Sequence, residues 1–114
     1  MSIKRAQPNT PGRTRRVEHG EVVYCVMTAD DKSDTMKGQT EQALRQIDEH
    51  LAAAGTDKSR ILTTTVYISD MARKDEMDEA WLAWVDAGNP PARACLGVTL
   101  HGTTQVEFVL SAAK

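Results

Sequence analysis

Residues 35–54 read TMKGQTEQALRQIDEHLAAA and give the clearest helical pattern in the chain. Apolar side chains recur there at spacings of three, four and seven, which places them along one stripe of an α-helix. Ser33 or Asp34 can cap the start of this helix, and Gly55 can close its end. An amphipathic helix needs an apolar partner, so the flanking residues should form a sheet. The stripe consists of Met36, Ala43, Leu44, Ile47, Leu51 and Ala54.

Strands are predicted on both sides of this helix. Residues 21–27 (EVVYCVM) precede it and residues 60–69 (RILTTTVYIS) follow it. Both stretches are rich in β-branched and apolar side chains, which favour extended backbone. Two shorter candidate strands, residues 3–5 and 14–18, lie in a polar N-terminal segment that Pro8 and other turn-forming residues interrupt.

The C-terminal half continues the alternation of helices and strands. Residues 73–87 form a second amphipathic helix, which Gly88 ends and the two following prolines prevent from continuing. Residues 92–100 and 105–112 are predicted strands separated by a turn at residues 101–104, and the two strands could pair as a hairpin. The apolar stripe of the second helix consists of Met77, Ala80, Trp81, Trp84 and Val85.

The predicted element order is β-β-β-α-β-α-β-β in a single domain that spans residues 1–114. We therefore expect an α+β fold, in which a mixed sheet carries both helices on one face. The strands supply more apolar surface than two helices can cover, and an exposed apolar face usually marks a subunit interface. The sequence thus predicts an oligomer. The strand residues behind this expectation are Val22, Val23, Val26, Val66, Ile68, Val98 and Val109.

Composition restricts the function classes. The chain has 14 basic and 16 acidic residues and a net charge of −2, which provides no general attraction to a phosphate backbone. A nucleic-acid partner is therefore not expected. No leader-like segment opens the chain, and no apolar run could span a bilayer, so we expect a cytoplasmic protein without a membrane partner. Gly-rich nucleotide-binding loops and the serine nucleophile motif are absent from the sequence.

The cysteines and histidines do not suggest a metal or cofactor. Cys25 and Cys95 lie in apolar, strand-like surroundings and are interpreted as buried free thiols, with a disulfide or a reactive thiol as the alternatives. His19, His50 and His101 are isolated, and no two of them have metal-ligand spacing. We therefore expect no metal site. His50 lies late in the first helix, where a cation suits the helix dipole.

Arg93 is the main candidate for a functional residue. It follows two prolines and begins an apolar run, so its charge must find an anion or several acceptors. Its planar fork matches a carboxylate, which leaves two interpretations open: a ligand carboxylate or an ion pair within the protein. Glu107 could lie near Arg93 if the last two strands form a hairpin. It would then orient water or move a proton, unless it simply faces solvent.

Two further groups have a structural and a functional interpretation. Trp81 and Trp84 lie three residues apart on a helix stripe, which favours core or interface packing over a stacking platform. Arg13, Arg15 and Arg16 form a small basic cluster. This cluster is either a solvated edge or a site that attracts an anionic ligand or RNA.

Several segments together resemble the RidA/YjgF family, from about Gly20 to the C-terminus. The most specific part is the Pro-Ala-Arg-x-Cys motif at residues 91–95, followed downstream by Val106-Glu107. Residues 81–88 look like a divergent branch of the family. The remaining matching segments are Gln39-Thr40, Ala53-Ala54-Gly55, Thr64-Thr65-Val66-Tyr67-Ile68-Ser69-Asp70-Met71 and Glu76-Met77.

The resemblance implies a chorismate-mutase-like fold that assembles as a homotrimer through its sheets, with ligand clefts between adjacent subunits. By motif match, Arg93 would hold a substrate carboxylate, and Glu107 would be the catalytic residue that positions a hydrolytic water. Ala94 and Cys95 would complete the substrate-binding stretch, in which the backbone of Cys95 contacts the substrate. The family's Gly-Pro-Tyr-Ser element is replaced here by residues 13–16, which contain no tyrosine, so one wall of the cleft differs.

The implied reaction is hydrolysis of a reactive enamine or imine, such as 2-aminoacrylate, to a 2-keto acid and ammonia. It would need no metal or cofactor, because positioning supplies much of the acceleration required for so unstable a substrate. Two alternatives remain. The protein could be a trimer that binds a small carboxylate without turnover, or it could be a ribonuclease or translation inhibitor, as some relatives are described.

Overall fold

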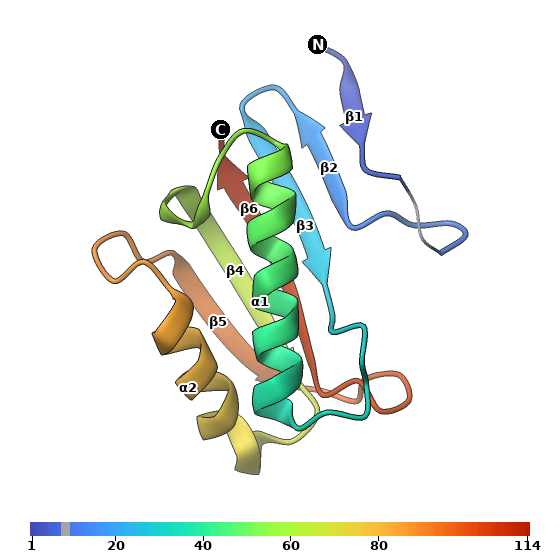
Figure 1. Cartoon of the computed structure of the whole chain (residues 1–114), viewed down its shortest axis with the longest axis vertical. Coiled ribbons are helices and arrows are strands. Elements are labelled where there is room, and N and C mark those ends of the chain that lie inside the picture. The colour runs from blue at the N-terminus through green and yellow to red at the C-terminus, as the bar shows by residue number, and fades with distance from the viewer. Residues whose placement is uncertain (8–9) are drawn as a thin grey trace.

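The computed structural model describes residues 1–7 and 10–114, so Pro8 lies outside the described residues. The predicted order of elements is confirmed (Figure 1). The strands are β1 (Ile3–Arg5), β2 (Arg16–His19), β3 (Val22–Met27), β4 (Ile61–Ile68), β5 (Ala92–Gly97) and β6 (Val106–Ala113). The helices are α1 (Met36–Ala53) and α2 (Lys74–Trp84), and 3-10 turns at Lys58–Arg60 and Met71–Arg73 precede β4 and α2.

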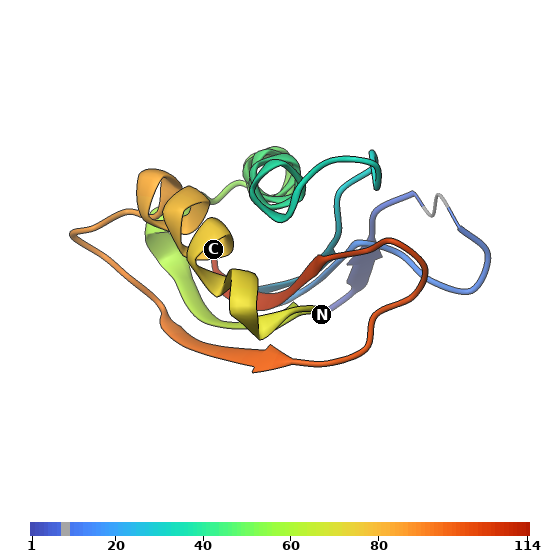
Figure 2. The same ribbon diagram turned by 90° about the horizontal axis from the view of Figure 1, so that it is seen from below.

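The six strands form one mixed sheet in the order β1-β2-β3-β6-β4-β5. Only the edge pair β4 and β5 is parallel, whereas β6 lies antiparallel between β3 and β4. Both helices lie on the same side of the sheet when the molecule is seen from below (Figure 2). The expected α+β fold with both helices on one face is therefore confirmed.

The predicted hairpin between the last two strands is wrong. Strand β5 follows α2 in a β4-α2-β5 crossover, and crossover connections of this kind return the chain parallel to the first strand. The chain then passes from the edge of the sheet to its middle before β6 begins. The turn at residues 101–104 is present, with Gly102 at φ +58°, but it serves this longer connection.

Helix α1 begins one residue later than the sequence suggested. Thr35 is the N-cap, because its hydroxyl accepts a hydrogen bond from the backbone N–H of Gly38 at 3.1 Å. Asp34 instead accepts from the backbone N–H of Thr35. Gly55, at φ +81°, ends the helix as predicted. Helix α2 ends at Trp84 rather than residue 87, since Val85 is already extended.

The core lies between the sheet and the two helices. Along β3 and β6 every second side chain is buried, so Val23, Cys25, Phe108 and Leu110 point towards the helices. Val66 and Ile68 also face the helices, so Val23, Val66 and Ile68 do not contribute to a spare apolar surface, which corrects the expectation. The opposite, open face of the sheet still exposes apolar side chains. These are Tyr24, Val26, Leu96 and Val109.

Within the described residues, no helix is long and apolar enough to cross a membrane. Cys25 and Cys95 are both free thiols, as the sequence suggested, but only Cys25 is fully buried and Cys95 is half-buried. Burial raises the pKa of the Cys25 thiol to about 11, so this cysteine is unreactive as a thiolate at neutral pH.

Candidate functional site

Arg93 points from β5 towards α2. Its Nη2 donates to Asp78 Oδ1 at 2.8 Å, and its guanidinium carbon lies 5.5 Å from the centre of the Trp81 ring. Its Nη1 contacts the sulfur of Met77 at 3.7 Å, a weak acceptor. The structure therefore contains the protein ion pair that the sequence left open. Arg93 keeps N–H donors that have no carboxylate partner among the described residues.

Asp78 is shared between two cations. Its Oδ2 also accepts a hydrogen bond from Lys74 Nζ at 2.6 Å. Burial works to raise the pKa of Asp78, but the hydrogen bonds from Lys74 and Arg93 outweigh it and hold that pKa below its usual value. Asp78 is therefore ionised at neutral pH, and a ligand carboxylate that approached Arg93 would compete with it.

Ala94 and Cys95 alternate along β5. Cys95 lies on the helix side and packs against the core, next to Arg93, whereas Ala94 is exposed on the open face. Burial raises the pKa of the Cys95 thiol, although nearby Arg93 partly opposes this effect. Ala94 and Cys95 thus lie on opposite faces of the edge strand β5.

Glu107 lies on the open face of the sheet. Its neighbours Val106 and Phe108 are fully buried under the helices, so the Glu107 side chain points the other way. It is half-buried at the wall of a cleft of about 430 Å³. The cleft is lined by Thr10, Arg13, Thr14, Arg15, Val26, Thr28, Asp30, Lys32, Leu100, His101, Thr104 and Glu107.

Arg93 and Glu107 are not brought together within one chain. Glu107 pairs in register with Tyr67 of β4, whereas Arg93 pairs with Thr64 of the same strand. Strand β4 thus separates them, and their side chains leave opposite faces of the sheet. The expectation that a hairpin would place Glu107 beside Arg93 is therefore wrong for a single subunit.

The cleft instead places Glu107 beside the basic N-terminal segment. Arg15 Nη2 forms an ion pair with Asp30 Oδ1 at 2.8 Å, and Arg15 Nη1 donates to the side-chain oxygen of Gln46. Lys32 Nζ donates to Thr28 Oγ1 at 3.1 Å. Burial lowers the pKa of Lys32, with a further contribution from Arg15, while Asp30 and Glu107 oppose the shift. Arg13, Thr14 and Arg15 thus form one wall of this cleft, whereas Arg16 does not line it.

Gln39 is a functional candidate that the sequence interpretation did not identify by itself. Its side chain is fully buried, and its Nε2 lies within hydrogen-bond distance of the backbone oxygens of Lys32, Asp34 and Thr103. Its Oε1 accepts from the backbone N–H of Gln105 at 2.9 Å. This amide therefore ties together the two loops that flank the cleft. The sequence did contain a signal for this role, because Gln39 is a polar residue on the apolar stripe of the helix, three residues after Met36.

The tryptophans have a packing role, as the sequence favoured. Trp81 is buried and stacks on Phe108 with 6.0 Å between ring centres. Trp84 packs against Trp81 at 5.5 Å and donates through Nε1 to Asp48 Oδ2 at 2.9 Å. The Trp81 ring is also the surface against which Arg93 lies.

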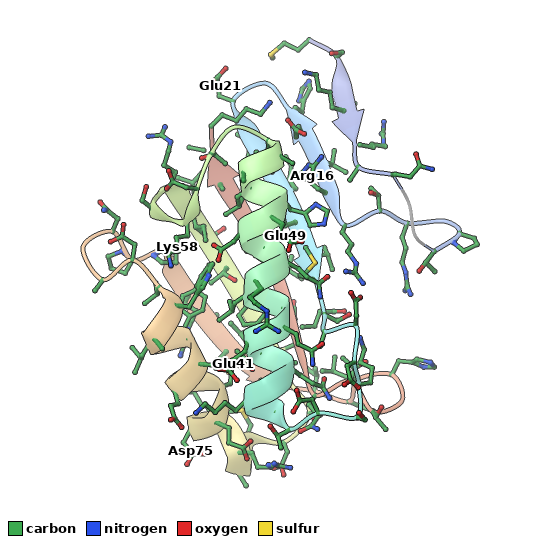
Figure 3. All side chains as sticks on the ribbon, in the orientation of Figure 1. Arg16, Glu21, Glu41, Glu49, Lys58 and Asp75 are labelled. Carbon is green, nitrogen blue, oxygen red and sulfur yellow. The ribbon has the colours of Figure 1, made fainter. Side chains whose placement is uncertain are left out.

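Arg16, the last residue of the basic cluster, has a structural role apart from the cleft. It extends from β2 towards α1 (Figure 3), where its Nη1 lies 2.8 Å from His50 Nδ1. Its Nε also donates to Glu18 Oε2 at 3.2 Å. Across residues 1–7 and 10–114, no group of three His, Cys, Asp or Glu side chains could hold a metal ion.

Comparison with known proteins defines the class of this domain. The family model described as Endoribonuclease L-PSP matches residues 15–114. A RutC family protein from Haemophilus ducreyi is 40% identical over 98 residues, which is 85% of this chain and 84% of that protein. The chain therefore belongs to the RidA/YjgF family, and the resemblance carried by the Pro-Ala-Arg motif is confirmed.

Two other similar proteins extend the comparison. The crystal structure of a YjgF family member from Neisseria meningitidis has a TM-score of 0.93 at 34% identity, and the match covers 100% of this chain and 96% of that one. A protein of Arabidopsis thaliana, named Reactive Intermediate Deaminase A, chloroplastic, is 33% identical over 58 residues. That match covers 51% of this chain and 31% of the plant protein.

Proposed function

We propose that this protein hydrolyses reactive enamines and imines, such as 2-aminoacrylate, to a 2-keto acid and ammonia. Arg93 binds the substrate carboxylate, Ala94 and Cys95 line the substrate, and Glu107 orients the attacking water. The observation that carries the proposal is the half-buried Glu107 carboxylate in a cleft of about 430 Å³. Family membership supports it, because one relative is named a reactive intermediate deaminase.

The site is built between two subunits of a homotrimer. One chain separates Arg93 from Glu107 by strand β4 and by the plane of the sheet, so one small substrate reaches both only if they come from adjacent subunits. The apolar open face around Glu107 supports this assembly, because Val26 and Val109 are exposed there at 44% and 38%. Arg93 lies on the edge strand β5, which a neighbouring subunit can approach.

The chemistry requires a held carboxylate and a directed water. 2-Aminoacrylate tautomerises to its imine, whose carbon is electrophilic. The water oxygen forms a bond to that carbon while the π electrons move to nitrogen, and Glu107 accepts a proton from the water. Glu107 then returns the proton to nitrogen. The resulting carbinolamine then loses its hydroxyl proton to Glu107, which passes it to the amino nitrogen. The carbonyl π bond forms as the carbon–nitrogen bond breaks, and ammonia and the 2-keto acid leave.

Arg93 can bind a carboxylate while it keeps its contact with Asp78. A guanidinium carries five N–H donors in a fixed plane, and the ion pair with Asp78 uses one of its nitrogens. The substrate carboxylate would thus bind at the remaining donors. Trp81, which lies under the guanidinium, holds its plane in a fixed orientation.

The composite site makes a sharp test possible. Arg93→Ala and Glu107→Gln should each abolish acceleration of imine hydrolysis. In the assay, semicarbazide traps the imine formed from 2-aminoacrylate, so an active protein lowers the amount of semicarbazone and an inactive variant does not. Trimers assembled from an equal mixture of the two inactive variants should regain about a quarter of the wild-type rate, because every mixed head-to-tail trimer contains one intact site. Recovery of activity supports a site between subunits, whereas a mixture as inactive as its parents would contradict it.

A second candidate, a trimer that binds a carboxylate without turnover, is favoured by the ion pair between Arg93 and Asp78. An arginine that already has a protein partner is suited to reversible binding. This candidate predicts 2-keto acid binding that Arg93→Ala abolishes, with no acceleration of imine hydrolysis by the wild-type protein. Light scattering provides a separate control, because a monomer would exclude the composite cleft in both cases.

A further inference from the structure

Lys32 is a cationic residue that shares a cleft with Glu107. It lies in the loop after β3, at the wall of the cleft that contains Glu107. Its Nζ donates to the Thr28 hydroxyl at 3.1 Å. Among the described residues it forms no ion pair, although it is half-buried. A partly desolvated ammonium whose contact is one neutral hydroxyl is a favourable site for an anion.

The charges around the cleft do not balance. Three cationic side chains and two carboxylates line it, and one carboxylate, Asp30, is already paired with Arg15. Lys32 and Arg13 therefore face Glu107 alone, which leaves one positive charge without a partner. Two of the three cations, Arg13 and Arg15, come from residues 13–16, and the third, Lys32, comes from the loop after β3.

The hydroxyl groups in the cleft suit the same kind of ligand. Thr28 is already the hydrogen-bond partner of Lys32, while Thr10 and Thr104 also line the wall. The hydroxyl of Thr14 donates instead to the backbone oxygen of Ala6 at 2.7 Å. Hydroxyls donate to carboxylate oxygens at little geometric cost, because the hydroxyl hydrogen can rotate to suit its partner. The buried amide of Gln39 fixes the loop that contains Lys32, because its Nε2 donates a hydrogen bond to the Lys32 backbone oxygen at 3.1 Å.

We infer that the preferred substrates carry a second acidic group, and that they are 2-imino acids derived from dicarboxylic amino acids. Lys32 and Arg13 bind the side-chain carboxylate, while Arg93 of the adjacent subunit binds the carboxylate next to the imine. The inference rests on the proposed deaminase function and deepens it. The cleft volume of about 430 Å³ lies in the usual range of ligand sites, roughly 300–1,000 Å³.

Recognition of the second acidic group on the substrate would mainly determine which imines the protein prefers. A site whose buried polar group needs a partner rejects an analogue that lacks this partner, because the group is then left unpaired. A substrate with an apolar side chain would leave Lys32 unpaired in a partly dehydrated cleft. Such a substrate should therefore react more slowly than an acidic substrate of the same length.

The test compares two imines of matched size, generated in place by amino-acid oxidases from glutamate and from norvaline. Both side chains have the same length, and only the first ends in a carboxylate. The wild-type trimer should favour the glutamate-derived imine in kcat/KM by about tenfold or more. Lys32→Gln should remove most of this preference, and Arg13→Gln should reduce it. Lys4→Gln, on the exposed strand β1, is the control with the same loss of charge and should keep the preference.

A binding measurement separates the failure of this inference from the failure of the proposed function. Calorimetric titration with 2-oxoglutarate and with 2-oxopentanoate uses the two corresponding products. Tighter binding of 2-oxoglutarate that Lys32→Gln abolishes, without turnover of either imine, would support the second acidic site and reject the deaminase. Equal turnover of both imines, or an unchanged preference in Lys32→Gln, would overturn the inference and leave the deaminase intact. Circular dichroism confirms that each variant is folded.

Discussion

The side chains of Arg93 and Glu107 project from opposite faces of the same sheet, and β4 lies between their strands. Arg93 points towards α2 and binds Asp78 at 2.8 Å, whereas Glu107 points away from the helices into an open cleft. In their proposed roles, as carboxylate anchor and water-orienting group, these two residues cannot act on one substrate within one chain. The proposed chemistry therefore depends on assembly.

The competition between Asp78 and a ligand for Arg93 can be measured. Asp78→Asn keeps the size of the side chain but removes the charge, so Arg93 becomes freer to bind a carboxylate. A half-exposed ion pair is worth up to about 1 kcal/mol, so 2-keto acid affinity should rise by about two- to fivefold. Calorimetric titration measures the change, and Glu79→Gln on the same helix is the control. A loss of affinity as large as in Arg93→Ala would show instead that Asp78 holds Arg93 in its binding orientation.

Gln39 should contribute to both stability and binding. Gln39→Leu removes the partners of the Gln105 N–H and of nearby backbone oxygens. Buried groups left without a partner cost about 1–3 kcal/mol each, so the free energy of unfolding should fall by about 2–4 kcal/mol. Urea denaturation measures it. Glu41→Leu, at an exposed position of the same helix, should change stability by less than about 0.5 kcal/mol. Equal effects of the two variants would contradict the bridging role of Gln39.

The elements of the fold follow closely from the sequence because each depends on local periodicity. The stripe that runs from Met36 to Leu51 predicted α1, and the β-branched run at residues 61–68 predicted β4. Pairing partners depend on distant parts of the chain. The sequence of residues 92–112 could not show that β6 inserts between β3 and β4 instead of pairing with β5.

The candidate site was predictable only in part, for the same reason. The motif around Arg93 identified the residue, but its partner Asp78 lies on a helix whose position over β5 is set by the crossover. The alternation of Val106, Glu107 and Phe108 could indicate that Glu107 faces away from the core. It could not show that Lys32 shares its cleft, because that contact depends on the course of an irregular loop.

Thr64 offers a position where stability should increase. It is buried beside Arg93 in the register of β4 and β5, and its hydroxyl has no hydrogen-bond partner among the described residues. Thr64→Val keeps the branched shape that favours a strand and removes the unpaired hydroxyl, which should stabilise the protein by about 1 kcal/mol. Thermal unfolding tests this, with the half-exposed Thr65→Val as the control. A lower melting temperature in Thr64→Val alone would show that the hydroxyl has a partner, such as an ordered water.

His50 should make the stability of the protein depend on pH. Its Nδ1 lies 2.8 Å from Arg16 Nη1, which requires a neutral imidazole as acceptor. Burial lowers the pKa of His50 below its ordinary value of 6.5, and Arg16 and Arg15 add to this effect while Glu49 opposes it. Between the lowered folded pKa and 6.5 the unfolded chain binds more protons than the folded one. Stability is therefore greatest above pH 6.5 and falls as the pH decreases through that window.

The His50 contribution can be isolated by substitution. The free energy of unfolding in urea should decrease between pH 8 and pH 5.5 in the wild-type protein. His50→Gln cannot gain a proton, so this decrease should become smaller, whereas the exposed His19→Gln should behave like the wild-type protein. Glu18 does not titrate between pH 8 and pH 5.5, because hydrogen bonding to Lys114 lowers the pKa of Glu18 below 4.5 and keeps it ionised throughout. A pH dependence that is identical in His50→Gln and the wild-type protein would assign the effect to other groups.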